Sequence, residues 1–214
     1  MKVFIIHYHK LTDRKIYMKK QLELNSLDGE FVEHYDRDTI EQKDLELFTP
    51  FMKAPHRRPF IATFLSHLYC YTQEFDVALV LEDDAILCPG FSSKLSDYMN
   101  QLPSDWDMLF IGDACDFHIP DTTPDQNVYF KSREQTSWGG HGATRAASSY
   151  VVTKQCAERI AAYAKNGQVF NMIDHWLNHV IRDLKLNIYW AEPTIVQPGS
   201  EIGMFQRSLN VGFT

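Results

Sequence analysis

The feature that most constrains the fold is an apolar run that ends in three consecutive acids. The run spans Val77 to Leu81 (VALVL), and Glu82, Asp83 and Asp84 follow it directly. A run that is apolar on both faces is typical of a strand in a parallel sheet covered by helices on both sides. Three adjacent carboxylates at the end of such a strand repel one another and are costly to desolvate, so a divalent cation would stabilise them. Oxygen ligands suit magnesium or manganese; a solvated turn is the alternative.

The composition is that of one globular domain. The chain has 214 residues, of which 44% are hydrophobic and 23% charged. Its net charge of -7 argues against a broad nucleic-acid-binding surface. No run of about 18 apolar residues predicts a membrane span, and the N-terminus lacks the pattern of a signal peptide. We therefore expect a cytoplasmic protein, whose contact with the inner membrane would be peripheral if the source is bacterial. The four cysteines are scattered without a CxxC pair, which indicates free thiols.

Strand and helix patterns alternate along the chain and predict an open α/β sheet. We expect strands at 2–6, 31–35, 77–81, 106–111, 150–153, 188–191 and 194–196, and helices at 13–24, 60–74, 91–101, 154–165 and 173–184. The polar segment 114–130 is expected to be a loop over the site. In open α/β sheets, ligands bind beyond the carboxyl ends of the strands. His7, after the first strand, and the acidic cluster should therefore share one rim.

A further carboxylate, Asp174, lies at the start of the last expected helix. A cation at the acidic cluster could neutralise a diphosphate, and Asp174 could act as a base, a combination that fits transfer of a group from a nucleotide diphosphate. A phosphatase with an aspartyl nucleophile would need an aspartate where Glu82 stands. The GxxxxGK[ST], strand-following GxGxxG and GxSxG patterns of P-loop, dinucleotide-binding and serine-hydrolase proteins are absent from the sequence.

Several segments, in the same order, resemble glycosyltransferase family 25, which includes bacterial lipooligosaccharide galactosyltransferases and procollagen galactosyltransferases. The most specific is 64–91 (FLSHLYCYTQEFDVALVLEDDAILCPGF), in which a Ser-His pair in a helix precedes the strand and its Glu-Asp-Asp. The others are 4–15 (FIIHYHKLTDRK), 146–160 (AASSYVVTKQCAERI), 173–178 (IDHWLN) and 196–202 (VQPGSEI). Together these segments extend over most of the chain.

The resemblance implies a fold and an activity. The fold would be of GT-A type: a Rossmann-like, open, mostly parallel α/β sheet flanked by helices, in a single domain over 1–214. Residues 1–113 would form about the nucleotide-sugar half and 114–214 the acceptor half. The activity would be metal-dependent, inverting transfer of a hexose, galactose or glucose, from a UDP-sugar to a hydroxyl of a glycan, glycolipid or glycoprotein. The cofactor would be Mn²⁺ or Mg²⁺.

The resemblance also implies roles for individual residues. Asp84 and Glu82 would bind the metal, and Asp174 would be the catalytic base. The nucleotide-sugar would contact His7, Arg14, Ser66, His67, Glu82, Asp83 and Gly140. A lone histidine in a helix is more commonly a core residue than a ligand, and only the resemblance moves His67 towards the donor.

The sequence departs from the family at three places. His7 stands where the family has asparagine and Lys10 where it has arginine; 146–149 (AASS) replaces a Gly-Thr and alanine segment; and no histidine follows His179 to supply a late metal ligand. Gln197, a water or a diphosphate oxygen would take that ligand's place. Two other functions remain open, a non-catalytic nucleotide-sugar or glycan-binding module and a metal-dependent phosphotransferase.

Overall fold

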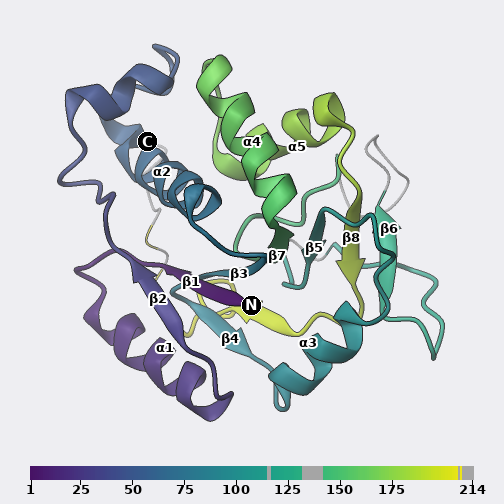
Figure 1. Cartoon of the computed structure of the whole chain (residues 1–214). Helices are drawn as coiled ribbons and strands as arrows, with labels where there is room; N and C mark the ends of the chain where they lie inside the picture. Colours follow the sequence, from purple (N-terminus) through teal and green to yellow (C-terminus); the bar gives the residue numbers. More distant parts are fainter. Residues whose placement is uncertain (115–116, 132–141, 207, 209–214) are drawn as a thin grey trace.

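A computed structural model describes residues 1–114, 117–131, 142–206 and 208, which form one seven-stranded sheet with helices on both faces (Figure 1). The strands, in spatial order, are β2 (Gly29–Val32), β1 (Lys2–Ile6), β3 (Val77–Glu82), β7 (Ser149–Thr153), β5 (Met108–Phe110), β8 (Ile188–Ala191) and β6 (Val128–Lys131). β1 pairs in parallel with β2 and β3, and β5 with β8, whereas β7 and β6 are antiparallel to their neighbours. The expected open, mostly parallel sheet is confirmed.

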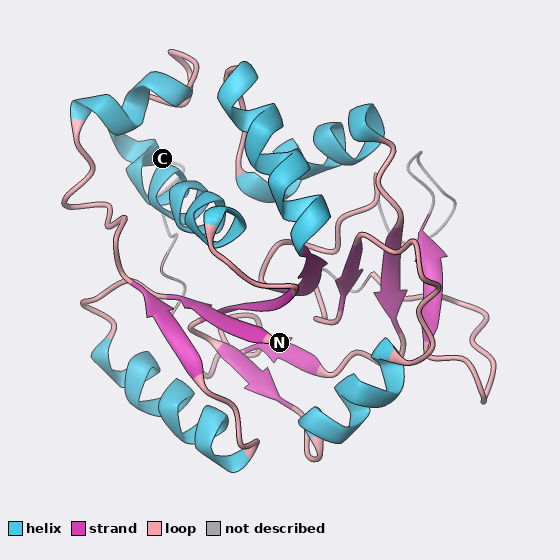
Figure 2. Ribbon diagram, viewed as in Figure 1, coloured by secondary structure: helices cyan, strands magenta, loops and turns pink. Residues whose placement is uncertain are grey.

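Five α-helices cover the two faces of the sheet among the described residues. Figures 1 and 2 show α2 (Arg58–Thr72), α4 (Lys154–Asn166) and α5 (Ile173–Leu184) on one face, and α1 (Thr12–Leu24) and α3 (Phe91–Met99) on the other. Two short 3-10 helices, η1 (Gln42–Leu47) and η2 (Pro55–Arg57), precede α2. None of the described helices is both long and apolar enough to cross a membrane.

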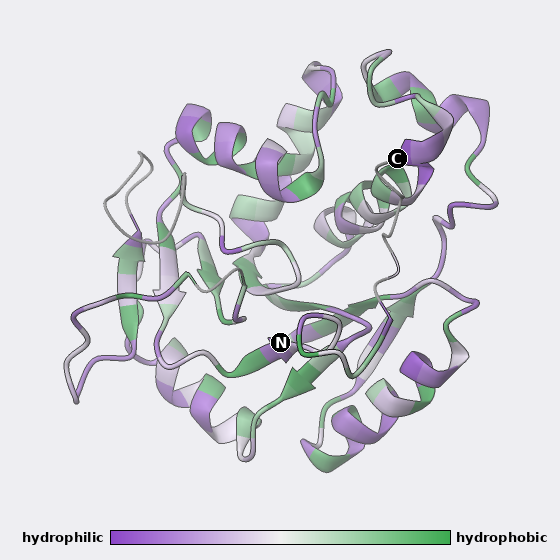
Figure 3. Ribbon diagram, turned by 180° about the vertical axis from the view of Figure 1, so that it is seen from behind, coloured by the Kyte–Doolittle hydropathy of each residue, from purple (hydrophilic) through white to green (hydrophobic). Residues whose placement is uncertain are grey.

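The pleat of β3 explains its unbroken apolar run. Ala78 and Val80 belong to the core beneath α2, α4 and α5, whereas Leu79 and Leu81 belong to the core beneath α1 and α3. Successive strand side chains point to opposite faces, so a strand buried on both faces is apolar at every position. In Figure 3 the central strands are accordingly green, while purple residues lie on the outer sides of the helices.

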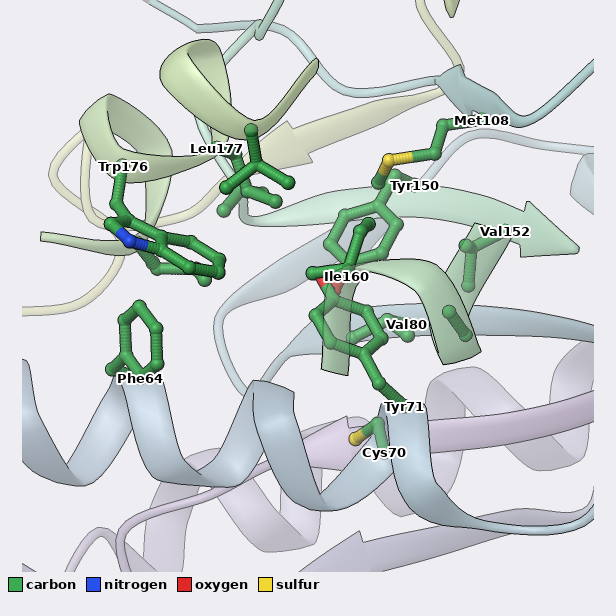
Figure 4. Packing of buried hydrophobic residues seen from close by; sticks show 14 of the residues in the cluster. Phe64, Cys70, Tyr71, Val80, Met108, Tyr150, Val152, Ile160, Trp176 and Leu177 are labelled. Carbon is green, nitrogen blue, oxygen red and sulfur yellow. The ribbon is translucent and has the colours of Figure 1, made fainter. Parts of the chain in front are cut away.

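The core beneath α2 fixes the position of α5. Trp176 is 2% exposed, and its ring lies edge-on to Phe64 of α2 with centroids 4.9 Å apart (Figure 4). Aromatic pairs prefer this edge-to-face geometry. Since Asp174 lies two residues before Trp176, this contact anchors the segment that carries the expected base.

Some element boundaries differ from the prediction. β6 begins inside the segment 114–130, which was expected to be a loop, and the backbone of its buried Val128 pairs with that of Ala191 in β8. β2 begins at Gly29, two residues early; a Cβ there would lie 2.9 Å from a methyl of Leu22, so glycine lets β2 pack against α1. A separate two-stranded sheet joins β4 (Ala85–Leu87) to β9 (Val196–Pro198), the latter shifted from the expected 194–196.

Three of the cysteines, Cys70, Cys88 and Cys156, are free as expected.

Candidate active site

A cavity of about 190 Å³ lies beyond the carboxyl end of β3 and brings together three of the predicted acids. Glu82 comes from the end of β3, Asp84 from the turn that follows, and Asp174 from the first turn of α5. The wall beside them is formed by 146–148, directly before β7. Residues that are 92 positions apart in the chain thus line one space, at the rim where open α/β sheets bind ligands.

Asp83 differs from its two neighbours because both of its carboxylate oxygens are already engaged. Arg14 Nη1 donates to Oδ1 at 2.7 Å, and His7 Nδ1 lies 2.7 Å from Oδ2, with the Tyr8 backbone N–H at 3.4 Å. Asp83 is 5% exposed and points away from the cavity, towards β1 and α1. Its position favours a structural role. His7 is engaged through Nδ1 alone, and the contacts of both residues with a nucleotide-sugar stay predictions.

Asp84 is held by the segment after β9. The Ser200 backbone N–H donates to Asp84 Oδ2 at 3.1 Å, and the Gly199 N–H donates to its backbone carbonyl at 2.8 Å. Arg14 Nη1 lies 3.8 Å from the same Oδ2. These contacts fix the carboxylate that was expected to bind a metal.

The same C-terminal segment also holds Arg14. Arg14 Nη2 donates to the Gln206 carbonyl at 2.6 Å, and the Phe205 ring lies 5.3 Å from the Arg14 guanidinium carbon. Tyr17 of α1 packs edge-on against Phe205 at 5.3 Å. Arg14 is 5% exposed, so its stem and head are both enclosed by protein. Its guanidinium therefore contributes positive charge to the acidic cluster from a fixed position.

The cavity carries more negative charge than Arg14 offsets. Burial, followed by the charges of Asp84, Asp83 and Asp174, raises the pKa of Glu82 to about 8. Without another cation, Glu82 is therefore mostly protonated near neutral pH. A bound divalent cation would reverse this effect, since a metal favours the ionised carboxylate.

The carboxylates of the cavity fit a metal ion whose remaining ligands come from the substrate and from water. Within the described parts of the chain, no group of three or more His, Cys, Asp or Glu side chains is arranged to hold a metal alone. Glu82 and Asp84 supply two carboxylates on one cavity, and Mg²⁺-type sites commonly combine one or two carboxylates with phosphate oxygens and waters. Gln197, considered as a third ligand, is exposed and lies outside the residues that line this cavity.

The helix pair Ser66-His67 lies in two different environments. Ser66 donates to the Ala62 carbonyl at 2.9 Å and borders a second cavity of about 30 Å³, next to His7 and Tyr8. His67 is fully buried, where its Nδ1 bonds the Tyr150 hydroxyl at 2.7 Å. Burial lowers the pKa of His67 to about 3, so the ring is neutral. This position favours a core role for His67, and its contact with the donor stays a prediction. Gly140 lies outside the described residues.

Asn178 is a site-forming residue that the sequence analysis missed. Its Oδ1 accepts hydrogen bonds from the Ala143 and Thr144 backbone N–H groups, at 2.8 and 2.9 Å. Thr144 Oγ1 in turn donates to the Asp174 carbonyl at 3.3 Å. The spacing Asp174-x-x-x-Asn178 places both side chains on one face of α5, which was the available signal. Asn178 thus fixes the loop that leads to the cavity wall.

The comparisons with known proteins identify a family. Residues 1–176 match the model of glycosyltransferase family 25 (LPS biosynthesis protein). No curated protein sequence matches the chain.

Three solved structures are similar in outline. One is a mutant Drosophila β-1,4-galactosyltransferase 7 in complex with manganese, UDP-Gal and xylobiose, at 9% identity and TM-score 0.46, covering 92% of this chain and 69% of that one. The second is the T. maritima inositol-1-phosphate CTP transferase, at 13% identity and TM-score 0.37, with coverage of 92% and 68%. The third is a glycosyltransferase involved in glycosylation of the PBCV-1 major capsid, at 9% identity and TM-score 0.36, with coverage of 90% and 95%.

These structural likenesses are too loose to carry a functional argument, whereas the family match extends over most of the chain. The α/β sheet has the architecture expected of that family, with its acids at the rim where ligands bind. The chain belongs to glycosyltransferase family 25 and is a glycosyltransferase.

Proposed function

We propose that this enzyme is a metal-dependent, inverting hexosyltransferase. It moves galactose or glucose from a UDP-sugar to a hydroxyl of a glycan, glycolipid or glycoprotein acceptor. The observation that carries the proposal is the single cavity lined by Glu82, Asp84 and Asp174. Two of these acids suit a cation, and the third, on a different element, suits a base. The proposal keeps the expected cytoplasmic location, with at most peripheral contact with a membrane, and the donor and acceptor halves at about 1–113 and 114–214.

Glu82 and Asp84 would hold Mn²⁺ or Mg²⁺. When bound, the ion supplies electrostatic stabilisation of the departing diphosphate. The protein prepares this site by fixing Asp84 with the Ser200 N–H and by placing Arg14 3.8 Å from the same oxygen. Arg14 also adds a positive charge beside the position where negative charge develops on the leaving group.

Asp174 is the proposed general base. It would take the proton from the acceptor hydroxyl while that oxygen attacks the anomeric carbon on the face opposite the leaving group. A positioned base contributes about 100- to 10,000-fold to turnover. Asp174 stays in place because Trp176 anchors α5 in the core and Thr144 bonds the Asp174 carbonyl.

The test is a nucleotide-release assay with UDP-galactose and UDP-glucose, with and without Mn²⁺. Asp174→Asn should lower turnover about 100- to 10,000-fold while the donor Kd stays within about 3-fold. Asp183→Asn, at the exposed far end of the same helix, is the matched control and should retain activity. A comparable loss of donor affinity in Asp174→Asn would remove the base assignment.

Asp84→Ala separates the metal site from the base. It should abolish Mn²⁺-dependent donor binding, measured by calorimetric titration with UDP. An unchanged Mn²⁺ titration would remove Asp84 from the metal site. Donor binding without any nucleotide release by the wild-type protein would instead indicate a binding module.

A further inference from the structure

Ser148 lies at the wall of the proposed active-site cavity. Its backbone carbonyl accepts a hydrogen bond from the Glu82 N–H at 2.8 Å, which fixes Ser148 directly beside the acid at the end of β3. It lines the cavity together with Ala146 and Ala147. Ser148 thus stands between the carboxyl ends of β3 and β5, on the far side of Glu82 from β1.

The hydroxyl of Ser148 is buried without a hydrogen-bond partner among the described residues. Of the side chains with such an unpartnered buried atom in that part of the chain, Ser148 alone lines the cavity. A buried hydroxyl without a partner is unfavourable, and such a group in a native protein calls for a partner from outside the chain, such as a water or a ligand. Rotation about χ1 moves a serine hydroxyl between staggered positions, so Ser148 can present its Oγ to a ligand in the cavity.

The backbone before Ser148 is built to leave space. Ala146 has φ 52, a left-handed conformation that residues other than glycine adopt rarely and that clusters at functional sites. The side chains of Ala146 and Ala147 are single methyl groups. The cavity of about 190 Å³ far exceeds the roughly 10–15 Å³ that a single water requires. It therefore has room for a group of several heavy atoms.

The chemistry of this wall suits a neutral hydroxyl-bearing ligand. The diphosphate, being anionic, would be drawn to Arg14 and to the cation that Glu82 and Asp84 would hold, whereas the segment 146–148 carries no charge. A serine hydroxyl both donates and accepts, which matches the hydroxyl of a sugar. The transferred hexose is the neutral part of the proposed donor that must lie beside Asp174.

We propose that Ser148 is a sugar-recognition residue, whose hydroxyl bonds one hydroxyl of the transferred hexose in the cavity. This inference rests on the proposed function. It assigns sugar selectivity to the segment 146–148, where the sequence departs from the family. A site that hydrogen-bonds a substrate hydroxyl discriminates strongly against donors that lack it, because a buried group is then left unpaired.

The test combines Ser148→Ala with deoxy donors. UDP-galactose, UDP-glucose and their 2-, 3-, 4- and 6-deoxy analogues are compared by kcat/KM for nucleotide release and by Kd in competition with UDP. With the wild-type protein, one deoxy donor should be about 10- to 100-fold worse than its parent. With Ser148→Ala, that penalty should shrink to about 2-fold, while the Kd for UDP alone stays unchanged.

Ser149→Ala is the matched control. Ser149 also has a buried, unpartnered hydroxyl, but it lies outside the cavity lining, where a Cβ on Gly112 would lie 2.0 Å from its Oγ. It should retain the full deoxy penalty. Both variants remove an unpartnered group, so their melting temperatures should not fall, and a loss of selectivity cannot be attributed to unfolding.

Two outcomes overturn the inference and are distinguishable. If the wild-type protein is active and Ser148→Ala shows the same deoxy penalties as the wild type, the role of Ser148 is overturned while the proposed function stands. A wild-type protein that binds neither UDP nor any of the UDP-sugars overturns the proposed function, and the role of Ser148 falls with it.

Discussion

Raising the pH from about 5 to about 7 should destabilise the metal-free protein through Glu82. In the folded protein, burial and the neighbouring acids raise the pKa of Glu82 from 4.5 to about 8, while the unfolded chain keeps the ordinary value. Between these two values the folded state holds a proton that the unfolded state has lost. The free energy of unfolding therefore falls as the pH rises through this window. The stabilisation is fully present below the unfolded pKa and is lost as the pH passes the folded pKa.

The size of the effect follows from the two pKa values. One proton changes the free energy of unfolding by about 1.4 kcal/mol per pH unit. Integrated from about pH 5 to about pH 7, with a pKa of 4.5 unfolded and about 8 folded, the loss is about 2.5 kcal/mol. Glu82→Gln keeps the shape of the side chain but removes the titration. The variant should therefore lack this loss.

The assay is urea denaturation of both proteins at about pH 5, 6 and 7, in a chelator. The quantity measured is the difference in unfolding free energy between wild type and Glu82→Gln, in which the titration of other groups cancels. Excess Mn²⁺ should stabilise the wild type more at the higher pH, since the metal must displace the proton. Parallel pH profiles for the two proteins would refute the reasoning, because Glu82 would then be ionised in both states.

Three further predictions concern how the site is held together. Arg14→Met should cost about 3 to 5 kcal/mol of stability, because it leaves the buried Asp83 with only part of its partners. Lys15→Met breaks a partly exposed ion pair and should cost less than about 1 kcal/mol. Thermal unfolding would distinguish the two variants. Gly142→Ala should lower stability by about 1 to 3 kcal/mol in urea denaturation, because Gly142 has φ 99 and a Cβ there would lie 2.4 Å from Asn178 Oδ1. Phe205→Ala should weaken Mn²⁺-dependent UDP binding about 10-fold, through loss of the packing that fixes Arg14; unchanged calorimetric binding would contradict that role.

Local patterns predicted the elements well because each is encoded by neighbouring residues. The run from Val77 to Leu81 fixed the central strand, and helical spacing fixed α2 and α5 to within about two residues. β6 was missed although Val128, Tyr129 and Phe130 are residue types that favour strands, because the run is short and follows a polar segment. Its pairing with β8 is a tertiary contact that a local pattern does not contain.

The acids of the site were predicted as a cluster, but not the different positions of its members. Nothing in the order Glu82-Asp83-Asp84 indicates that the middle acid turns away to bond Arg14, 69 positions earlier. The arrangement of Asp174 beside Glu82 was likewise inferred from chemistry rather than from spacing. The contacts of Ser200 with Asp84, 116 positions apart, had no local signal at all.

Residues 199–206 hold the acidic cluster in place, and this has a consequence for when the enzyme becomes active during its synthesis. The family match ends at residue 176, yet Asp84 is oriented by the Ser200 N–H and Arg14 by the Gln206 carbonyl. A nascent chain that has exposed every predicted carboxylate still lacks these contacts. Sugar transfer, and the metal binding proposed for it, should therefore begin only after the segment around residue 206 has emerged from the ribosome, so that a truncated translation product would be inert rather than partly active.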